Sequence, residues 1–400
     1  MIHLDAVETL AFGGVVLFAG YALCRLIPFL GRYNIPEPVI GGLVMALIAL
    51  GAYHFDATLV EFDTSLQQPL MVAFFTTVGV NASVALLRVS GRQVMIFLAL
   101  ASVFAVLQNL LGMSVAALFG LHPLFGVLAG STTLTGGPAT GLAFAPLFEQ
   151  AGVVGAESIA ISSAMAGIIC GGVIGGPAIT ILIRRFKLRS ANGAAGAGGT
   201  GEVASSDDEP QDDAGREFAA LKSIVIILVA MWAGAWVGQG FEALGLTLPA
   251  YIGAMLVGAL IRNIDDYTGW IGLSVRSTDV IGNVALALFL AVALMNLRLW
   301  ELSGLALPLL LNLGLQIVLV VLFCVPVFRV MGRDYDAAVM GGGFIGFMLG
   351  TTANAMAVMR TLVERYGAAP RAFLVAPLVG AFFIDFTNAL IITGFLNFWQ

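Results

Sequence analysis

Ten apolar runs long enough to cross a lipid bilayer constrain this chain more than any other feature of its sequence. A transmembrane helix needs roughly 20 predominantly apolar residues, and somewhat shorter runs are accommodated by the bilayer. Only 10% of the residues are charged and the mean hydropathy is +0.98, whereas soluble domains carry about 25% charged residues. We therefore expect an all-α integral membrane protein, and no alternating strands of a membrane barrel are visible. The runs lie near residues 9–30, 36–53, 69–87, 93–120, 158–183, 221–241, 249–261, 280–297, 304–328 and 372–398.

Two further apolar segments, near 122–148 and 336–359, are interrupted by glycine and threonine. Cytoplasmic loops carry the excess of Lys and Arg. If the N-terminus lies outside and both segments return to the side they entered from, 17 of the 18 basic residues face the cytoplasm and only Arg298 lies outside. If both segments cross, the basic residues divide 8 to 10. The charges therefore predict ten spans and two re-entrant hairpins, with both termini outside.

The hairpin tips are rich in hydroxyl groups and glycine, with GSTTLTGGPATGL at 130–142 and GGFIGFMLGTTANAM at 342–356. Non-helical backbone at membrane depth is tolerated only where it is buried in protein or lines a wet cavity. Free N–H groups at helix starts suit a carboxylate, and unwound carbonyl groups suit a cation. Thr132 adds one more hydroxyl to the first tip. We predict that the substrate is bound by Thr133, Thr135, Gly136, Gly137, Thr140, Gly350, Thr351, Thr352 and Asn354.

The two halves of the chain match weakly at a constant offset, since Asn296 follows Asn81 by 215 residues in similar surroundings. Five crossings in each half would invert the second copy, and inverted repeats with broken helices are typical of secondary transporters. We assign the first repeat to 1–184 and the second to 218–400. The segment 185–217 is rich in Gly and Ala and then acidic, so we expect a disordered cytoplasmic linker there.

Asp385 is the only acidic residue near the middle of a predicted span. A charge at the bilayer centre costs about 2.5–3.5 kcal/mol on insertion scales, so it is normally paired or functional. Asn388 lies one helical turn further on the same face. Carboxylate and amide oxygens suit Na⁺, and we predict that Na⁺ is bound by Asp385 and Asn388, and also by the repeat-related Asn81 and Asn296, which line the path. A structural role for Asp385 is the alternative.

Other intramembrane amides, at Gln108, Asn109 and Gln316, are expected to make interhelical hydrogen bonds. Nothing indicates an enzyme or an ATP-driven pump, because the chain has no Gly-rich loop that ends in Gly-Lys-Ser/Thr. The three cysteines are isolated in apolar segments and predict neither a disulfide nor a metal centre. We expect no catalytic residue, no nucleic-acid partner and no cofactor, with Na⁺ as the coupling ion.

Several longer stretches closely resemble the bacterial glutamate:sodium symporter family over nearly the whole chain. They are IPEPVIGGL (35–43), LMVAFFTTVGVNA (70–82), GSTTLTGG (130–137), GNVALALFLAVALMNLRLWEL (282–302), GRDYDAAVM (332–340) and FLVAPLVGAFFIDFTNAL (373–390). The resemblance implies an inner-membrane protein of two inverted five-helix halves with paired re-entrant loops. It also implies Na⁺-driven uptake of L-glutamate.

The chain departs from the family pattern at both tips. The family typically continues the paired glycines with His-Gly-Thr, whereas this chain has Pro138-Ala139-Thr140. At the second tip, the usual Gly-Ala-Thr-Pro-Thr becomes the sequence Gly-Thr-Thr-Ala-Asn at 350–354. A proline removes an amide N–H and fixes the turn, so the identity of the substrate is less securely implied than the fold and the Na⁺ coupling.

We predict a secondary active transporter in the bacterial inner membrane that moves Na⁺ and L-glutamate together by alternating access. The alternative substrate is another di- or tricarboxylate, coupled to Na⁺ or H⁺, because no basic residue is expected at the midplane. A passive channel is a further alternative, since opposed re-entrant segments also line channels. A homodimer is common for such architectures and is the assembly we expect.

Overall fold

The computed structural model describes residues 2–27, 30, 35–55, 60–190, 213–243, 245 and 248–399. Within these residues the protein is helical, apart from a short parallel pairing of β1 (Ile2–Leu4) with β2 (Val60–Phe62). Seven helical segments there are long and apolar enough to cross a membrane, which agrees with the predicted multi-pass, all-α class. They are α1 (Ala6–Leu26), α3 (Glu37–His54), α5 (Val84–Leu118) from Gly91 onward, α8 (Ala156–Arg185), α9 (Asp213–Ala243), α11 (Val275–Met295) and α12 (Ala306–Val330).

The other helices include those of the two predicted hairpins and of three predicted spans. They are α4 (Gln67–Val80), α6 (Pro123–Val127), the π-helix η1 (Leu128–Thr132), α7 (Gly137–Gln150), α10 (Ala250–Thr268), the 3₁₀-helix η2 (Leu299–Leu302), α13 (Tyr335–Met348), α14 (Thr352–Tyr366), α15 (Pro370–Leu378), the π-helix η3 (Val379–Phe383) and α16 (Ile384–Trp399). The run predicted at 69–87 forms a helix only to Val80, and the chain resumes as α5. Residues 191–212 of the predicted linker lie outside the described residues.

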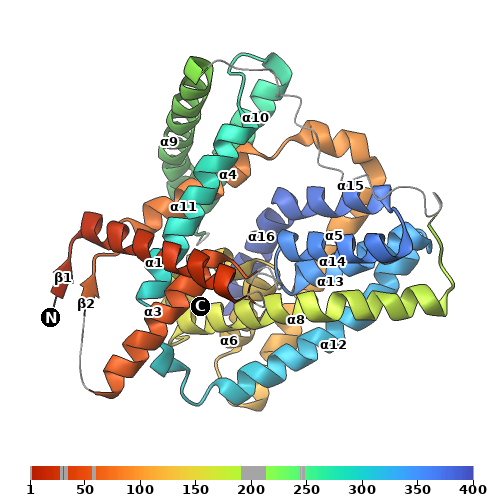
Figure 1. Cartoon of the computed structure of the whole chain (residues 1–400), viewed down its shortest axis with the longest axis horizontal. Helices are drawn as coiled ribbons and strands as arrows, with labels where there is room; N and C mark the ends of the chain where they lie inside the picture. The colour runs from red at the N-terminus through yellow and green to blue at the C-terminus, as the bar shows by residue number, and fades with distance from the viewer. Residues whose placement is uncertain are drawn as a thin grey trace. The chain divides into compact units, whose positions relative to one another are not determined.

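Two compact units divide the chain, and each takes segments from both halves of the sequence. Unit 1 comprises Met1–Gly31, Pro36–Ala85 and Val203–Glu301, and unit 2 comprises Arg32–Ile35, Leu86–Glu202 and Leu302–Gln400. The helices α1, α3 and α4 in red to orange, and α9, α10 and α11 in green to teal, therefore form unit 1 (Figure 1). The repeats predicted at 1–184 and 218–400 are not themselves compact units, because each contributes to both.

Unit 1 is packed through helix pairs that approach closely at glycines. α1 packs on α3, and α10 packs on α4 and α9. A side chain at Gly20 of α1 would collide with the backbone of α3 at Glu37, and one at Gly79 of α4 would collide with the backbone at Met255 of α10. Small residues at such positions let membrane helices gain dispersion energy and interhelical contacts at short separation. These glycines therefore determine how closely α1 can pack on α3 and how closely α4 can pack on α10.

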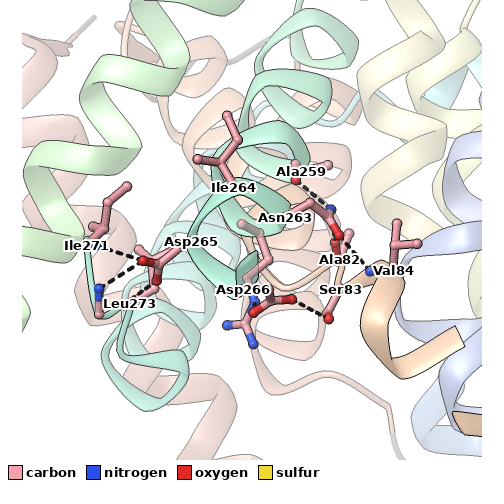
Figure 2. A network of polar contacts seen from close by, with 12 residues as sticks. Ala82, Ser83, Val84, Ala259, Asn263, Ile264, Asp265, Asp266, Ile271 and Leu273 are labelled. Carbon is pink, nitrogen blue, oxygen red and sulfur yellow. Dashed lines mark hydrogen bonds and ion pairs between the residues drawn. The ribbon is translucent and has the colours of Figure 1, made fainter. Parts of the chain in front are cut away.

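A polar network joins the end of α10 to the break between α4 and α5 (Figure 2). The Asn263 side chain accepts from the Val84 N–H at 2.8 Å and donates to the Ala82 carbonyl at 2.9 Å. Asp266 accepts from the Ser83 hydroxyl at 2.5 Å. Backbone groups at a helix break lack intrahelical partners, so the side chains of α10 satisfy them and hold the break in place.

Asp265 points away from this break in Figure 2 and holds the loop that follows α10. Its carboxylate accepts from the backbone N–H groups of Ile271 at 2.7 Å, Gly272 at 3.0 Å and Leu273 at 2.8 Å. Burial raises the pKa of this carboxyl group, but the three backbone hydrogen bonds, helped by the charge of Arg262, outweigh that effect and leave the pKa below its usual range. Asp265 is therefore ionised at neutral pH.

Unit 2 buries α13, the first helix of the second hairpin, among aromatic side chains. The Phe344 ring lies 5.8 Å from that of Phe97 and 5.3 Å from that of Phe104, both on α5, and 5.7 Å from that of Phe323 on α12. Such aromatic pairs add about 0.5–1.5 kcal/mol each beyond their buried area. All of α13 except Asp336 is buried, which is the environment that a broken segment at membrane depth requires.

Candidate substrate and cation site

The first predicted hairpin is a helix that breaks inside the protein. α6 leads into the π-helical turn η1, the backbone leaves helical geometry at Gly130 (φ −103°, ψ −126°), and α7 begins at Gly137. Residues 124–135 are all buried. Because buried backbone groups need partners, the break can persist only where other side chains supply the missing hydrogen bonds.

The second hairpin breaks between α13 and α14. Thr351 is the N-cap of α14, and its hydroxyl accepts from the Asn354 N–H at 3.4 Å. The two tips are in contact, because a Cβ atom at Gly137 would lie 3.6 Å from the Thr351 methyl carbon and 3.7 Å from the Gly350 carbonyl oxygen. The structure therefore brings together the two tips that the sequence analysis assigned to one site.

Two consecutive, fully buried amides on α5 support these tips. The Gln108 side chain accepts from the Thr135 hydroxyl at 2.5 Å and donates to the Met348 carbonyl, at the end of α13, at 2.9 Å. The Asn109 side chain accepts from the Ser131 N–H at 2.9 Å. The expectation of hydrogen bonds between helices is confirmed for both amides, since Met348 belongs to α13 and Ser131 to η1, while Thr135 lies in the turn before α7.

Two buried amides on α12 complete the support. Asn312 donates to the Ala129 carbonyl of η1 at 2.6 Å, and Gln316 donates to the Gln108 backbone carbonyl at 2.8 Å. Asn312 was not among the residues singled out from the sequence. The signal that could have found it is its place in an apolar run, four residues before Gln316, because the two amides then share a helix face.

The α16 side of the site is where buried oxygen atoms lack partners. Asn388 donates its side-chain N–H to the Ser131 carbonyl at 2.9 Å. Its own Oδ1 atom and the hydroxyls of Ser131 and Thr132 are buried without a hydrogen-bond partner among the described residues. Asp385, one turn earlier, has no hydrogen-bond or ion-pair partner within the same described residues. Buried polar atoms normally have partners, so the unpaired oxygens of Asn388, Ser131 and Thr132, with the half-buried Asp385 carboxylate one turn away on α16, have the composition of a cation site.

Na⁺ fits this donor set because it is a hard cation that prefers oxygen ligands. A single carboxylate with neutral amide and hydroxyl oxygens matches its single charge. The part of the chain that the structure describes contains no group of three or more His, Cys, Asp or Glu residues that could hold a metal ion. The oxygens of Asp385, Asn388, Ser131 and Thr132 could therefore hold Na⁺, and the sequence analysis had not included Ser131.

The remaining predicted substrate residues are mostly engaged in fixing the tips. Thr352 donates to the Gly380 carbonyl of η3 at 2.9 Å, and Asn354 donates to the Ile168 carbonyl of α8 at 2.7 Å. The Thr133 hydroxyl donates to the Leu128 carbonyl at 2.8 Å. Gly136 and Thr140 lie together, since a Cβ atom at Gly136 would be 2.6 Å from that of Thr140. The Oδ1 atom of Asn354 has no partner among the described residues.

The predicted ligands Asn81 and Asn296 belong to unit 1, unlike the hairpin residues. Each is the C-cap of its helix, Asn81 after α4 and Asn296 after α11, with nearly the same backbone angles. Asn81 donates to the Asp279 carboxylate at 2.6 Å. The sequence analysis missed Asp279 because it stands at the edge of the apolar run 280–297. Asn81 therefore belongs to a polar contact between α4 and α11 within unit 1.

Comparison with known proteins identifies the family. Residues 2–368 match the family described as sodium/glutamate symporter. The chain belongs to the sodium/glutamate symporter family. The sodium/glutamate symporters of Escherichia coli (strain K12) and Shigella flexneri are each 42% identical to it over 401 residues, which cover 99% of this chain and 98% of each relative. That of Haemophilus influenzae (strain ATCC 51907 / DSM 11121 / KW20 / Rd) is 37% identical over 399 residues, covering 96% and 95%.

Membership of the sodium/glutamate symporter family confirms the resemblance found in the sequence motifs. A family of symporters is one of transporters, so the expectation that this chain is not an enzyme is also confirmed. In unit 2 of this family member, both hairpins contain a helix break and carry buried oxygen atoms that have no partner among the described residues.

Proposed function

We propose that this protein is a secondary active transporter that couples the uptake of L-glutamate to the entry of Na⁺. The observation that carries the proposal is the 42% identity to a sodium/glutamate symporter over 99% of the chain. The geometry of unit 2 supports it, because two buried helix breaks touch at their tips and leave oxygen atoms without protein partners.

The glutamate site in this proposal lies where the tips meet. The start of α14 presents backbone N–H groups and the positive end of a helix dipole, both of which favour a carboxylate. α7 begins with Gly137 and Pro138, and the proline removes one N–H donor there. The residues proposed to bind the substrate are Thr133, Thr135, Gly136, Gly137, Thr140, Gly350, Thr351, Thr352 and Asn354.

The Na⁺ site in this proposal consists of Asp385 and Asn388 of α16 with the hydroxyls of Ser131 and Thr132. Its support is the set of unpaired oxygens on Asn388, Ser131 and Thr132, where a 2.9 Å hydrogen bond joins Asn388 to Ser131, together with the position of Asp385 one turn earlier on α16. We retain Asn81 and Asn296 as the proposed lining of the ion path within unit 1. No cofactor other than the coupling ion is proposed.

We further propose ten spans and two re-entrant hairpins arranged as inverted repeats, in a homodimer in the bacterial inner membrane. The helix positions support the repeat, because α7 and α14 begin 215 residues apart, at Gly137 and Thr352. α8 and α15 begin 214 residues apart, at Ala156 and Pro370. The bias of basic residues supports external termini and a cytoplasmic linker.

Alternating access follows from these elements in the proposal. The hairpins that hold both ligands belong to one compact unit, so that unit can move as a body and open the site to either side in turn. The transporter moves only when both ligands are in place, since a half-filled site leaves either a buried carboxylate or a substrate charge without a partner. Movement of the loaded site then couples the two fluxes.

The test is uptake of radiolabelled L-glutamate into proteoliposomes that contain the purified protein. We expect saturable accumulation with an inward Na⁺ gradient and none with K⁺ in place of Na⁺. Competition with unlabelled L-aspartate, succinate and citrate tests the substrate, because Pro138 and Ala139 depart from the family pattern at the first tip. The absence of Na⁺-dependent accumulation of L-glutamate, or a unitary channel conductance, would overturn the proposal.

A further inference from the structure

We propose that Gln108 is a positioning residue that makes glutamate binding and Na⁺ binding interdependent by connecting both hairpin tips through one side chain. The inference rests on the proposed function, since it concerns how the two ligands of that site influence one another. It assigns no ligand contact to Gln108 itself.

One planar amide bridges the two breaks. Its Oε1 atom accepts from the Thr135 hydroxyl of the first hairpin at 2.5 Å, and its Nε2 atom donates to the Met348 carbonyl of the second at 2.9 Å. The same Thr135 hydroxyl lies 3.4 Å from the Met348 sulfur. Because the amide plane is rigid, a displacement of either tip changes the geometry of the bond to the other.

The adjacent residue extends this connection to the proposed Na⁺ site. Asn109 accepts from the Ser131 N–H at 2.9 Å, while the Ser131 carbonyl accepts from Asn388 at 2.9 Å. Ser131 is thus held on both sides, by α5 through its N–H and by the cation-binding face of α16 through its carbonyl. A continuous series of hydrogen bonds and two adjacent α5 residues therefore joins the proposed Na⁺ ligands to the end of α13.

The bridge is itself held firmly. The Gln108 backbone carbonyl accepts from Gln316 at 2.8 Å, and Gln316 also reaches Asn312 at 3.4 Å. The side chains of Gln108 and Gln316 are fully buried and that of Asn312 is 2% exposed. Burying an amide is unfavourable unless its hydrogen bonds are made, and a leucine would fill a similar volume without that requirement. The amide at position 108 is therefore explained by its bonds to the hairpins rather than by packing.

Two ligands that order the same linked tips share the cost of that ordering, so the first to bind improves the affinity for the second. Such coupling typically changes affinity by about 5–150-fold. Without the Gln108 side chain, each tip would become ordered independently of the other. Na⁺ would then lose most of its effect on glutamate affinity, even where each ligand still binds.

The experiment measures the Kd of L-glutamate at low and at saturating Na⁺, with the purified protein in lipid nanodiscs. The coupling factor is the ratio of the two values. We expect a factor of at least about 5 in the parent protein and a factor near one in Gln108→Leu. Ser114→Ala, on the same helix, removes an exposed hydroxyl that donates to the Leu110 carbonyl of its own helix; it is the matched control and is expected to keep the parent factor.

A second variant tests the same connection without touching Gln108. Asn109→Leu removes the acceptor of the Ser131 N–H, so it is also expected to bring the coupling factor near one. This variant decides the question if Gln108→Leu fails to fold. A purely structural role would lower the unfolding temperature of the ligand-free protein and leave the coupling factor unchanged.

The outcomes separate this inference from the proposed function. If the parent protein binds L-glutamate with no dependence on Na⁺, the proposed function fails. If the parent shows the dependence and both Gln108→Leu and Asn109→Leu retain it in full, the proposed function stands and the role of Gln108 is overturned.

Discussion

Asn388 donates a 2.9 Å hydrogen bond to the carbonyl of Ser131, 257 residues away in the sequence. This bond fixes the last helix of the chain against the break in the first hairpin. It uses only the N–H side of the Asn388 amide, so within the described part of the chain the Oδ1 atom is buried and unpaired, next to a segment with two more unpaired hydroxyls. The carboxylate of Asp385 completes the same helix face. The predictions below test whether these oxygens bind Na⁺.

Asp385→Asn is expected to raise the Na⁺ concentration that half-activates uptake by about 10–150-fold. An interaction with a charged group contributes about 1.5–3 kcal/mol to binding, and the substitution removes that contribution. Uptake of L-glutamate into proteoliposomes at a series of Na⁺ concentrations gives the half-activating concentration. Glu364→Gln, at an exposed carboxylate of α14 in the same unit, is the control and should match the parent. An unchanged Na⁺ response in Asp385→Asn would exclude this carboxylate as a ligand.

Ser131→Ala and Thr132→Val separate ion binding from folding. Neither hydroxyl has a hydrogen-bond partner among the described residues, and removal of an unpaired buried hydroxyl is neutral or stabilising. We expect thermal unfolding without Na⁺ to be unchanged or slightly higher in temperature, while Na⁺ binds about 2–12-fold more weakly. Stabilisation of the protein against unfolding by added Na⁺ measures this affinity. Equal stabilisation by Na⁺ in the parent and both variants would contradict the proposed ligand set.

Gly350→Ala is expected to abolish uptake by displacing the second tip. A Cβ atom there would lie 2.6 Å from the Asn354 side-chain nitrogen and 3.0 Å from the Gly346 carbonyl oxygen, so the Asn354 side chain must move away from its bond to the Ile168 carbonyl. Gly176→Ala on α8 meets no atom within 4 Å and should retain uptake, with a gain in stability of about 0.5–1 kcal/mol from helix propensity. The two alanine variants are compared by initial uptake rate and by unfolding temperature. Parent-like transport by Gly350→Ala would show that the tip tolerates the shift.

Asp265→Asn is expected to destabilise unit 1 in a pH-dependent way. The folded state lowers the pKa of Asp265, so its stabilising contribution is fully present above the unfolded pKa of about 3.9 and is lost as the pH falls through the lower folded value. The difference in unfolding temperature between parent and variant should therefore be largest near pH 7 and shrink below about pH 4. Glu242→Gln, at an exposed carboxylate of α9, controls for general charge effects. If the difference in unfolding temperature grew as the pH fell, the pKa of Asp265 would be raised rather than lowered by folding.

The helix breaks could be predicted from the sequence because their causes are local. GSTTLTGGPATGL combines glycine, proline and hydroxyl residues between apolar segments, and such a run is a poor membrane helix in any surroundings. The structure places the breaks there, at Gly130 and between α13 and α14. Asp385 could be predicted as a functional residue for the same reason, because an acidic residue near the middle of an apolar run is a local feature of the sequence.

The supporting groups of the site could not be predicted in the same way. Gln108 and Asn109 were recognised as buried amides, but their partners Met348 and Ser131 are separated from them by 240 and 22 residues. Ser131 looked like one hydroxyl among several, and only its unpaired state distinguishes it. That state depends on what every neighbouring helix offers, which no local pattern contains.

By itself, the sequence determined which segments are apolar enough for a bilayer, where their helices break and to which family the chain belongs. These properties follow from hydropathy, backbone chemistry and residue identity along the chain. Only the tertiary structure decided that each compact unit contains segments from both halves of the sequence. It also decided that the Asn388 side chain donates to the Ser131 carbonyl while its Oδ1 atom has no partner among the described residues. The physical reason is that a hydrogen bond forms with whichever group packing brings within about 3 Å, however far apart the two residues lie in the sequence.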